Sequence, residues 1–165
     1  MRAPVFTDTL QVGFVVRDLE ASMRTCVEQY GIGPWKIFDF NPGDAQDTIK
    51  DDKPATFAMR IAIAEVGKVQ WELIQPLDDT SSYAEFLAEK GEGVHHLQMA
   101  VANYDDTVSE LTGRGHSVLI GGRFGGTPLV YLSTDRDLGV ITEIVDWDAP
   151  GHGLEPVAVY PPDAA

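Results

Sequence analysis

Apolar and polar positions alternate along several short segments of the chain, and longer segments of helical spacing lie between them. Residues 10–16 alternate and are rich in Val and Phe, which predicts a half-buried strand. Asp18 stands before an apolar stripe with intervals of three and four residues, so a helix is predicted from there until Gly31 ends it. Further elements are predicted at 35–40, 57–66 and 69–75 as strands, and at 80–90 as a short helix.

The same order of elements then begins again. A strand is predicted at 94–101, with Asn103 as the N-cap of a helix that runs to about residue 113. Three more strands are predicted near 117–121, 128–133 and 139–146. Two segments lack either pattern: the polar segment 41–55, which is expected to be a mobile loop, and the Pro-rich segment 148–165, which is expected to be an irregular tail.

The second half of the chain repeats the first in its strand faces, helix cap and helix stripe. Gln11 and the residues after it align with His96 and those after it, and the same alignment places Asp18 over Asn103. Each half is then strand, helix, strand, strand, strand. We therefore expect one α+β domain over residues 1–165, built from two tandem βαβββ modules at about 8–77 and 93–147 that form a curved, cup-like mixed sheet with helices outside.

Four polar side chains occupy matched positions on the face of the sheet that the helices do not cover. Gln11 and His96 come from the first strands of the two modules, and Glu72 and Glu143 from the last. Related by a pseudo-twofold axis, they can meet at the centre of the sheet, where burial is costly unless something satisfies them. A divalent cation would do so, because one imidazole nitrogen and three oxygen donors form a suitable coordination shell.

Composition and charge exclude several classes of partner. The formal net charge is −14, from 26 acidic and 12 basic residues, which disfavours nucleic acids and anionic membrane surfaces. No apolar run approaches the length that spans a bilayer. The single cysteine, Cys26, cannot form an internal disulfide, which favours a reducing, cytoplasmic location. A small molecule is the expected partner.

The chain resembles the vicinal oxygen chelate superfamily, which includes glyoxalase I, methylmalonyl-CoA epimerase, extradiol dioxygenases and the bleomycin resistance proteins. The resemblance covers about residues 8–147 and lies in four ordered segments: QVGFVVRDLEAS, VQWELIQPL, GEGVHHLQMAV and GVITEIVDW. The second and third look most like the methylmalonyl-CoA epimerase and glyoxalase branch.

The resemblance implies a divalent metal ion, such as Co, Ni, Mn, Zn or Fe, held by one side chain from each of four strands. Carried over by motif, the ligands are Gln11, Glu72, His96 and Glu143. Glu143 is the implied catalytic base, and Glu72 is the alternative or second base. This set is similar to that of some glyoxalase I enzymes and differs from the usual epimerase set. Relatives often form homodimers, so a homodimer is expected here as well.

The expected function is that of a metal-dependent isomerase or epimerase, which moves a proton next to a carbonyl through a metal-stabilised enolate. The alternatives are a glyoxalase I-like lactoylglutathione lyase and a metal-free protein that sequesters a ligand, as resistance proteins do. The aromatic residues and the negative charge favour a small, neutral or aromatic substrate. Trp35, Phe38 and Phe57 are the candidate substrate-binding residues.

Overall fold

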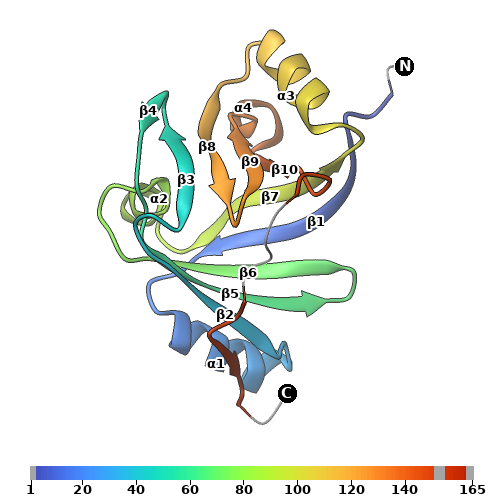
Figure 1. The fold of residues 1–165 in the computed structure, drawn as a ribbon. Coiled ribbons are helices and arrows are strands. Elements are labelled where there is room, and N and C mark those ends of the chain that lie inside the picture. Colours follow the sequence, from blue (N-terminus) through green and yellow to red (C-terminus); the bar gives the residue numbers. More distant parts are fainter. Residues whose placement is uncertain (1–2, 151–154, 163–165) are drawn as a thin grey trace.

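The computed structural model describes residues 3–150 and 155–162, which form a mixed sheet with helices packed around it (Figure 1). The helices are α1 (Leu19–Tyr30), α2 (Ser82–Lys90), α3 (Tyr104–Gly113) and the single turn α4 (Asp135–Leu138). In the order in which they lie across the sheet, the strands are β11 (Ala158–Tyr160), β2 (Trp35–Phe40), β5 (Met59–Val66), β6 (Val69–Pro76), β1 (Phe6–Val15), β7 (Gly93–Val101), β10 (Ile141–Val145), β9 (Thr127–Leu132), β8 (Val118–Phe124), β3 (Ala45–Lys50) and β4 (Lys53–Pro54).

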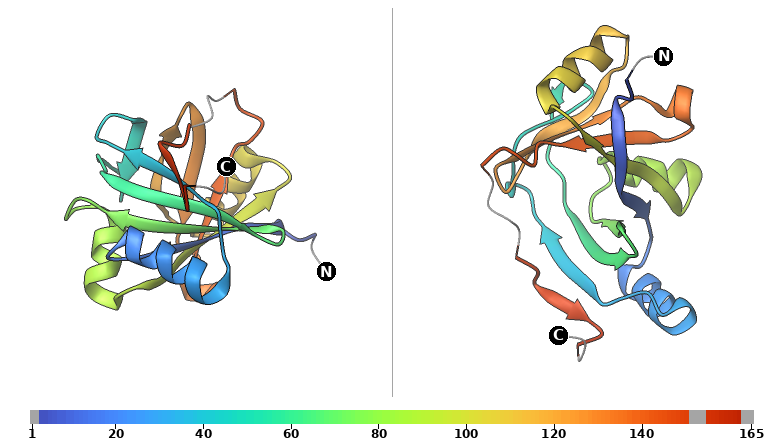
Figure 2. Two further views of the ribbon diagram at one scale, coloured as in Figure 1. Left: turned by 90° about the horizontal axis from the view of Figure 1, so that it is seen from below. Right: turned by 90° about the vertical axis from the view of Figure 1, so that its right-hand side faces the viewer.

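The two modules meet at the central pair of strands. β1 pairs with β7 in antiparallel fashion, and each has the last strand of its own module, β6 or β10, as its parallel neighbour on the other side. The order outward is therefore mirrored: β1, β6, β5, β2 in one module and β7, β10, β9, β8 in the other. This arrangement, curved and unclosed in Figure 2, confirms the predicted α+β fold with a mixed, cup-like sheet.

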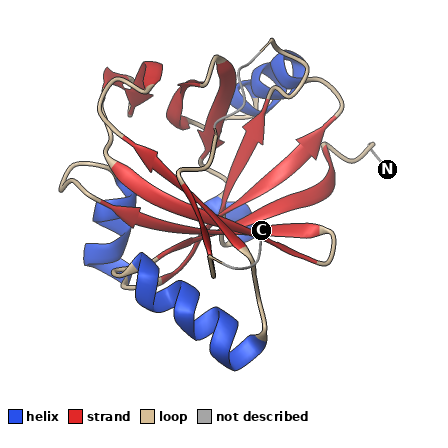
Figure 3. Ribbon diagram, turned by 60° about the horizontal axis from the view of Figure 1, so that its bottom comes forward, coloured by secondary structure: helices blue, strands red, loops and turns tan. Residues whose placement is uncertain are grey.

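Alternation along each strand divides the core into an inner and an outer part. Helices lie against the outer face of the sheet (Figure 3). There α1 packs its stripe, including Leu19 and Met23, against β2, β5 and β6, while α3 packs Leu111 against β9 and β10. On the inner face, β2, β5 and β6 contribute one wall, and β8 and β9 contribute the other. The helix α2 joins the two modules and adds Tyr83 to this inner cluster.

The predicted helix caps are confirmed. Asp18 Oδ1 accepts a hydrogen bond of 2.9 Å from the amide of Ala21, and Asn103 Oδ1 accepts one of 2.8 Å from Asp106. Gly31 ends α1 at φ 66°, a left-handed conformation that suits glycine. None of the helices in the described part of the chain is both long and apolar enough to cross a membrane.

The prediction of a mobile loop over 41–55 is wrong. Residues 45–50 form β3, which pairs antiparallel with β8 of the other module, and Lys50 Nζ donates a 2.9 Å hydrogen bond to the carbonyl of Thr80. The strand lies near one edge of the sheet, where polar side chains face solvent, so its sequence lacks the apolar alternation that marks a strand.

The C-terminal segment also contains structure that the sequence pattern did not indicate. Residues 158–160 form β11, which pairs with β2 and extends the opposite edge of the sheet, so the prediction of an irregular tail is wrong for these residues. The parts of the predicted tail at 151–154 and 163–165 lie outside the described residues.

Asp78 fixes the connection between β6 and α2, and its removal is expected to destabilise the protein. Its Oδ1 accepts hydrogen bonds from the amides of Thr80 (2.8 Å) and Ser81 (2.6 Å), and its Oδ2 accepts one from Ala58 (2.9 Å). Burial alone would raise the pKa of Asp78, but the bonds from these three amides hold it below its ordinary value.

We expect Asp78→Ala to lower the free energy of unfolding by about 1–2 kcal/mol at neutral pH, measured by urea denaturation. Because the folded-state pKa is lowered, the stabilisation is complete above the ordinary Asp pKa of 3.8 and is lost as the pH falls through the folded-state value. Asp79→Ala, at an exposed neighbour, is the control and should stay within about 0.5 kcal/mol of wild type. Equal stability of both variants at pH 7 would contradict this role.

Candidate active site

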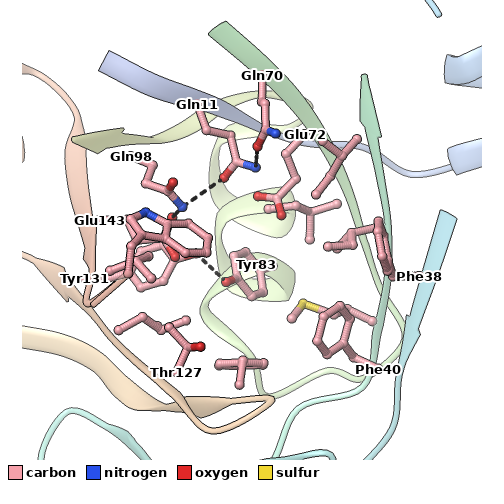
Figure 4. Close-up of a pocket in the computed structure, with 18 residues that line it drawn as sticks. Gln11, Phe38, Phe40, Gln70, Glu72, Tyr83, Gln98, Thr127, Tyr131 and Glu143 are labelled. Atoms are coloured by element: carbon pink, nitrogen blue, oxygen red, sulfur yellow. Dashed lines mark hydrogen bonds between the residues drawn. The ribbon is translucent and has the colours of Figure 1, made fainter. Parts of the chain in front are cut away.

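A cavity of about 310 Å³ opens on the inner face of the sheet, between the two modules (Figure 4). Its floor is polar and is formed by residues of the central strands: Gln11, Gln70, Glu72, Gln98 and Glu143. Its walls are mostly apolar and include Phe38, Phe40, Met59, Ile61, Phe124 and Leu129. The volume lies at the lower end of the range for small-molecule sites.

Three of the four predicted metal ligands lie close together: Glu72 and Glu143 line the cavity floor, and His96 contacts both of them without lining the cavity. His96 is fully buried on β7, and its Nε2 lies 3.5 Å from Glu72 Oε2 on β6 and 3.4 Å from Glu143 Oε2 on β10. Both glutamates are more than nine-tenths buried as residues. One imidazole nitrogen therefore faces two carboxylates, one from each module.

The fourth predicted ligand, Gln11, lies in a row of polar side chains that crosses the sheet beside this group. The register places Gln11 opposite Gln70 on one side and Gln98 on the other, and Gln98 opposite Glu143. Gln11 Nε2 donates to Gln70 Oε1 (3.4 Å), and Gln98 Nε2 donates to Gln11 Oε1 (3.4 Å) and Glu143 Oε2 (2.8 Å). The two modules are thus connected through side-chain amides.

Gln98 was not among the predicted site residues, although the sequence contains a signal for it. It follows His96 by two residues and therefore points to the same face of β7. Its contact with the Glu143 carboxylate makes it the residue that orients this side chain.

The kinds of side chain present, though not their present arrangement, suit a divalent cation. His96 Nε2 is buried and has no hydrogen-bond partner among the described residues, so its lone pair or proton is unsatisfied there. Two atoms that each bind one ion at about 2.1 Å lie about 3.0–3.4 Å apart, which is close to the separations between this nitrogen and the two carboxylates. Within residues 3–150 and 155–162, however, no group of three or more His, Cys, Asp or Glu side chains is arranged so that it could hold a metal ion. Side chains would therefore have to move for a cation to bind.

Burial and the charges of neighbouring side chains shift the pKa values of Glu72 and His96. Desolvation, reinforced by the charge of Glu143, raises the pKa of Glu72 to about 7 despite the opposing effect of His96. Burial alone would lower the pKa of His96, but the carboxylates of Glu143 and Glu72 raise it. The floor of the cavity therefore attracts positive charge, whether a proton or a metal ion.

His95 has a structural position beside this group. Its ring lies between those of Tyr83 and Phe86, with centroid distances of 5.0 and 5.2 Å, and burial lowers its pKa to about 3. Its Nδ1 lies 3.2 Å from Nδ1 of His96, so one of the two nitrogens donates to the other. His95 thereby fixes the orientation of the His96 ring.

Gly13 provides the space that the His96 ring occupies. It stands on β1 directly between Glu72 and His96 in the register of the sheet. A Cβ at this position would lie 2.1 Å from His96 Cε1, which is far inside van der Waals contact. The sequence signal is a glycine inside a strand, which often marks a close approach of another group.

Of the three predicted substrate-binding residues, one lines the cavity and two do not. Phe38 lines the cavity, as expected. The expectation for Trp35 is wrong: it lies on the outer face of β2, fully buried under α1, and its Nε1 donates to the carbonyl of Ile32 (2.9 Å). Phe57 is buried in the inner cluster, but it does not reach the cavity wall. Trp147, which was not predicted, lines the cavity and is 65% exposed.

Comparison with known protein families identifies the family to which this chain belongs. Residues 10–131 match the family described as the glyoxalase/bleomycin resistance protein/dioxygenase superfamily. The chain belongs to this superfamily. The matched segment contains three of the four residues that we consider as ligands, and the resemblance noted from the sequence is confirmed at this level.

Individual relatives of this superfamily member are distant. The chain is 28% identical over 106 residues to the uncharacterized protein YqjC of Bacillus subtilis strain 168, covering 61% of this chain and 71% of that one. Methylmalonyl-CoA epimerase of Mycobacterium tuberculosis superposes with a TM-score of 0.64 at 23% identity, covering 88% and 91% of the two chains. The Streptomyces coelicolor enzyme, in complex with 2-nitronate-propionyl-CoA, gives 0.66 at 22%, covering 90% and 99%. These likenesses establish a shared fold.

Gly13→Ala is expected to displace the His96 imidazole, because the new methyl group would occupy its place. We predict a loss of about 1–3 kcal/mol in the free energy of unfolding, measured by thermal and urea denaturation. Gly113→Ala is the control: it lies in α3, a Cβ there meets nothing within 4 Å, and it should be neutral or stabilise by up to about 1 kcal/mol. Equal stability of Gly13→Ala and wild type would show that the ring does not need this space.

Proposed function

We propose that this protein is a metal-dependent isomerase or epimerase that moves a proton at the carbon next to a carbonyl of a small, neutral substrate. The observation that carries the proposal is the placement of Glu72 and Glu143. The two carboxylates come from equivalent strands of the two modules and lie within 3.5 Å of one buried imidazole nitrogen, at the floor of an apolar cavity.

Two carboxylates beside one bound substrate, one from each module, suit a reversible proton transfer. Glu143 takes the proton from the carbon, and the electron pair moves towards the carbonyl oxygen to form an enolate. Return of a proton from the Glu72 side to the same carbon inverts its configuration. If that carbon also bears a hydroxyl group, loss of the hydroxyl proton together with protonation of the former carbonyl carbon moves the carbonyl instead. The apolar walls exclude water, which strengthens these electrostatic interactions.

Gln11, Glu72, His96 and Glu143 are the residues that would hold the metal. When bound there, a divalent cation supplies Lewis-acid polarisation of a substrate oxygen. The His96 imidazole, supported by His95 and accommodated by Gly13, gives this set its one nitrogen donor.

The cavity favours a neutral substrate over an anionic one. Among the described residues that line it there is no Lys or Arg, whereas two carboxylates are present. CoA esters and glutathione conjugates carry negative charge, so we prefer a neutral, apolar or aromatic carbonyl compound. The epimerase activity named for the Mycobacterium and Streptomyces proteins supports the reaction class.

One contact supports a second candidate, a metal-free protein that sequesters a neutral ligand. Gln98 Nε2 donates to Glu143 Oε2 at 2.8 Å, so the amide row already satisfies one carboxylate without a cation. Uptake of Co, Ni, Mn, Zn or Fe at close to one equivalent would exclude this alternative. Ligand binding without metal uptake or turnover would favour it.

The proposal predicts that the wild-type protein exchanges the carbon-bound proton of a neutral carbonyl compound with solvent. The probe is (R)-benzoin in deuterium oxide, followed by proton NMR for exchange and by chiral chromatography for racemisation. Glu143→Gln keeps the shape of the side chain and removes the base, so we expect a fall of about 10²-fold or more in kcat. Glu28→Gln, on the exposed side of α1, is the control and should retain wild-type rates.

Metal content is measured for each variant, because Glu143→Gln also alters a proposed ligand. Unchanged exchange in a Glu143→Gln variant of equal metal content would remove this residue from the reaction. Methylmalonyl-CoA is tested in parallel, and saturable turnover of this thioester would contradict the preference for a neutral substrate.

A further inference from the structure

Two tyrosine hydroxyls meet at the wall of the cavity. Tyr83, on the first turn of α2, and Tyr131, on β9, are both buried, and both line the cavity (Figure 4). Tyr83 Oη donates a hydrogen bond of 3.0 Å to Tyr131 Oη. With Tyr83 as the donor of this bond, the Tyr131 hydroxyl keeps its own proton for a bound substrate, since a hydroxyl can rotate to accept one bond and donate another.

Tyr131 lies next to the proposed base. In the antiparallel pair of β9 and β10 it stands directly opposite Glu143, so the two side chains are neighbours on the inner face. Its ring centroid is also 4.8 Å from that of His96. In the first module the equivalent position opposite Glu72 is occupied by Ile63. The hydroxyl is thus a feature of the Glu143 side alone.

The side-chain amides at the cavity floor are partly engaged with neighbouring side chains, and of the three only Gln98 donates two hydrogen bonds. The Nε2 donors bond to a neighbouring oxygen: Gln11 to Gln70, Gln70 to Glu65, and Gln98 to both Gln11 and Glu143. By contrast, none of the hydrogen bonds found among the described residues uses the proton of Tyr131. Burial and the nearby carboxylates also raise the pKa of both tyrosines, which keeps them neutral and able to donate.

We propose that Tyr131, oriented and polarised by Tyr83, donates a hydrogen bond to the reacting oxygen of the substrate and stabilises the negative charge that develops there. This inference rests on the proposed function. It assigns Tyr131 as a catalytic residue and Tyr83 as a positioning residue, and it places the substrate oxygen on the Glu143 side of the cavity.

The step conserves atoms and charge. The carbon-bound proton passes to the Glu143 carboxylate, the electron pair of the broken bond forms a carbon–carbon double bond, and the carbonyl electrons move to oxygen. Tyr131 keeps its proton throughout and shares it with that oxygen through a hydrogen bond. Because the bond strengthens as charge develops, it favours the transition state over the bound ketone.

The first test measures donation directly and needs no turnover. Benzophenone is neutral and aromatic and has no hydrogen on a saturated carbon next to its carbonyl, so it can bind without reacting. With carbonyl-labelled benzophenone, infrared difference spectra should show a shift of the bound carbonyl stretch to lower wavenumber. Tyr131→Phe should abolish most of this shift, Tyr83→Phe should reduce it, and Tyr104→Phe, a half-buried control on α3, should leave it unchanged.

An equal shift in wild type and Tyr131→Phe, no shift in wild type, or no binding of benzophenone would overturn the proposal. The second test is benzoin exchange: Tyr131→Phe should lower kcat by about 10²-fold with KM changed by less than about threefold, and an unchanged kcat would overturn the catalytic role. If the infrared shift depends on Tyr131 but the wild-type protein does not exchange benzoin, the proposed function is wrong. The shift would still support Tyr131 as a hydrogen-bond donor to the carbonyl oxygen of a ligand.

Discussion

The site depends on one electrostatic constraint: a fully buried imidazole nitrogen lies within 3.5 Å of two buried carboxylates and has no hydrogen-bond partner in the part of the chain that the structure describes. Two carboxylates in one buried place repel each other and lose their hydration. Burial raises the pKa of Glu72, and the two carboxylates raise that of His96, so a bound proton would offset part of this cost. A divalent cation would compensate more completely, because it also satisfies the free nitrogen.

Several features of the sheet position Glu72, His96 and Glu143. The central strands β1 and β7 bring the modules together, and Gly13 opens the space between Glu72 and His96. The amide row of Gln70, Gln11 and Gln98 fixes the adjacent positions on the same face. The duplicated modules place Glu72 and Glu143 at equivalent positions. Their surroundings differ, because Ile63 lies opposite Glu72 and Tyr131 lies opposite Glu143. This inequivalence suits a reaction in which one carboxylate removes a proton and the other returns one.

The sequence predicted the floor of the site because two simple regularities determine it. Side chains alternate along strands, and the modules repeat, so Gln11, Glu72, His96 and Glu143 could be placed on one face without knowledge of distant contacts. Trp35 could not be placed, because β2 is apolar on both faces and only its pairing decides which face meets α1. The pairing of β3 with β8, and the approach of Tyr83 to Tyr131, join segments far apart in the chain. The pattern of residues within one segment does not predict contacts with a distant segment.

We propose that one side chain from each of four strands binds a single cation, and X-ray absorption spectroscopy of the cobalt- or zinc-loaded protein measures this coordination. We expect a coordination shell of oxygen atoms and one imidazole nitrogen at about 2.0–2.2 Å, with the imidazole signal lost in His96→Ala. Two or more imidazoles, a sulfur ligand, or a shell that His96→Ala leaves unchanged would contradict it.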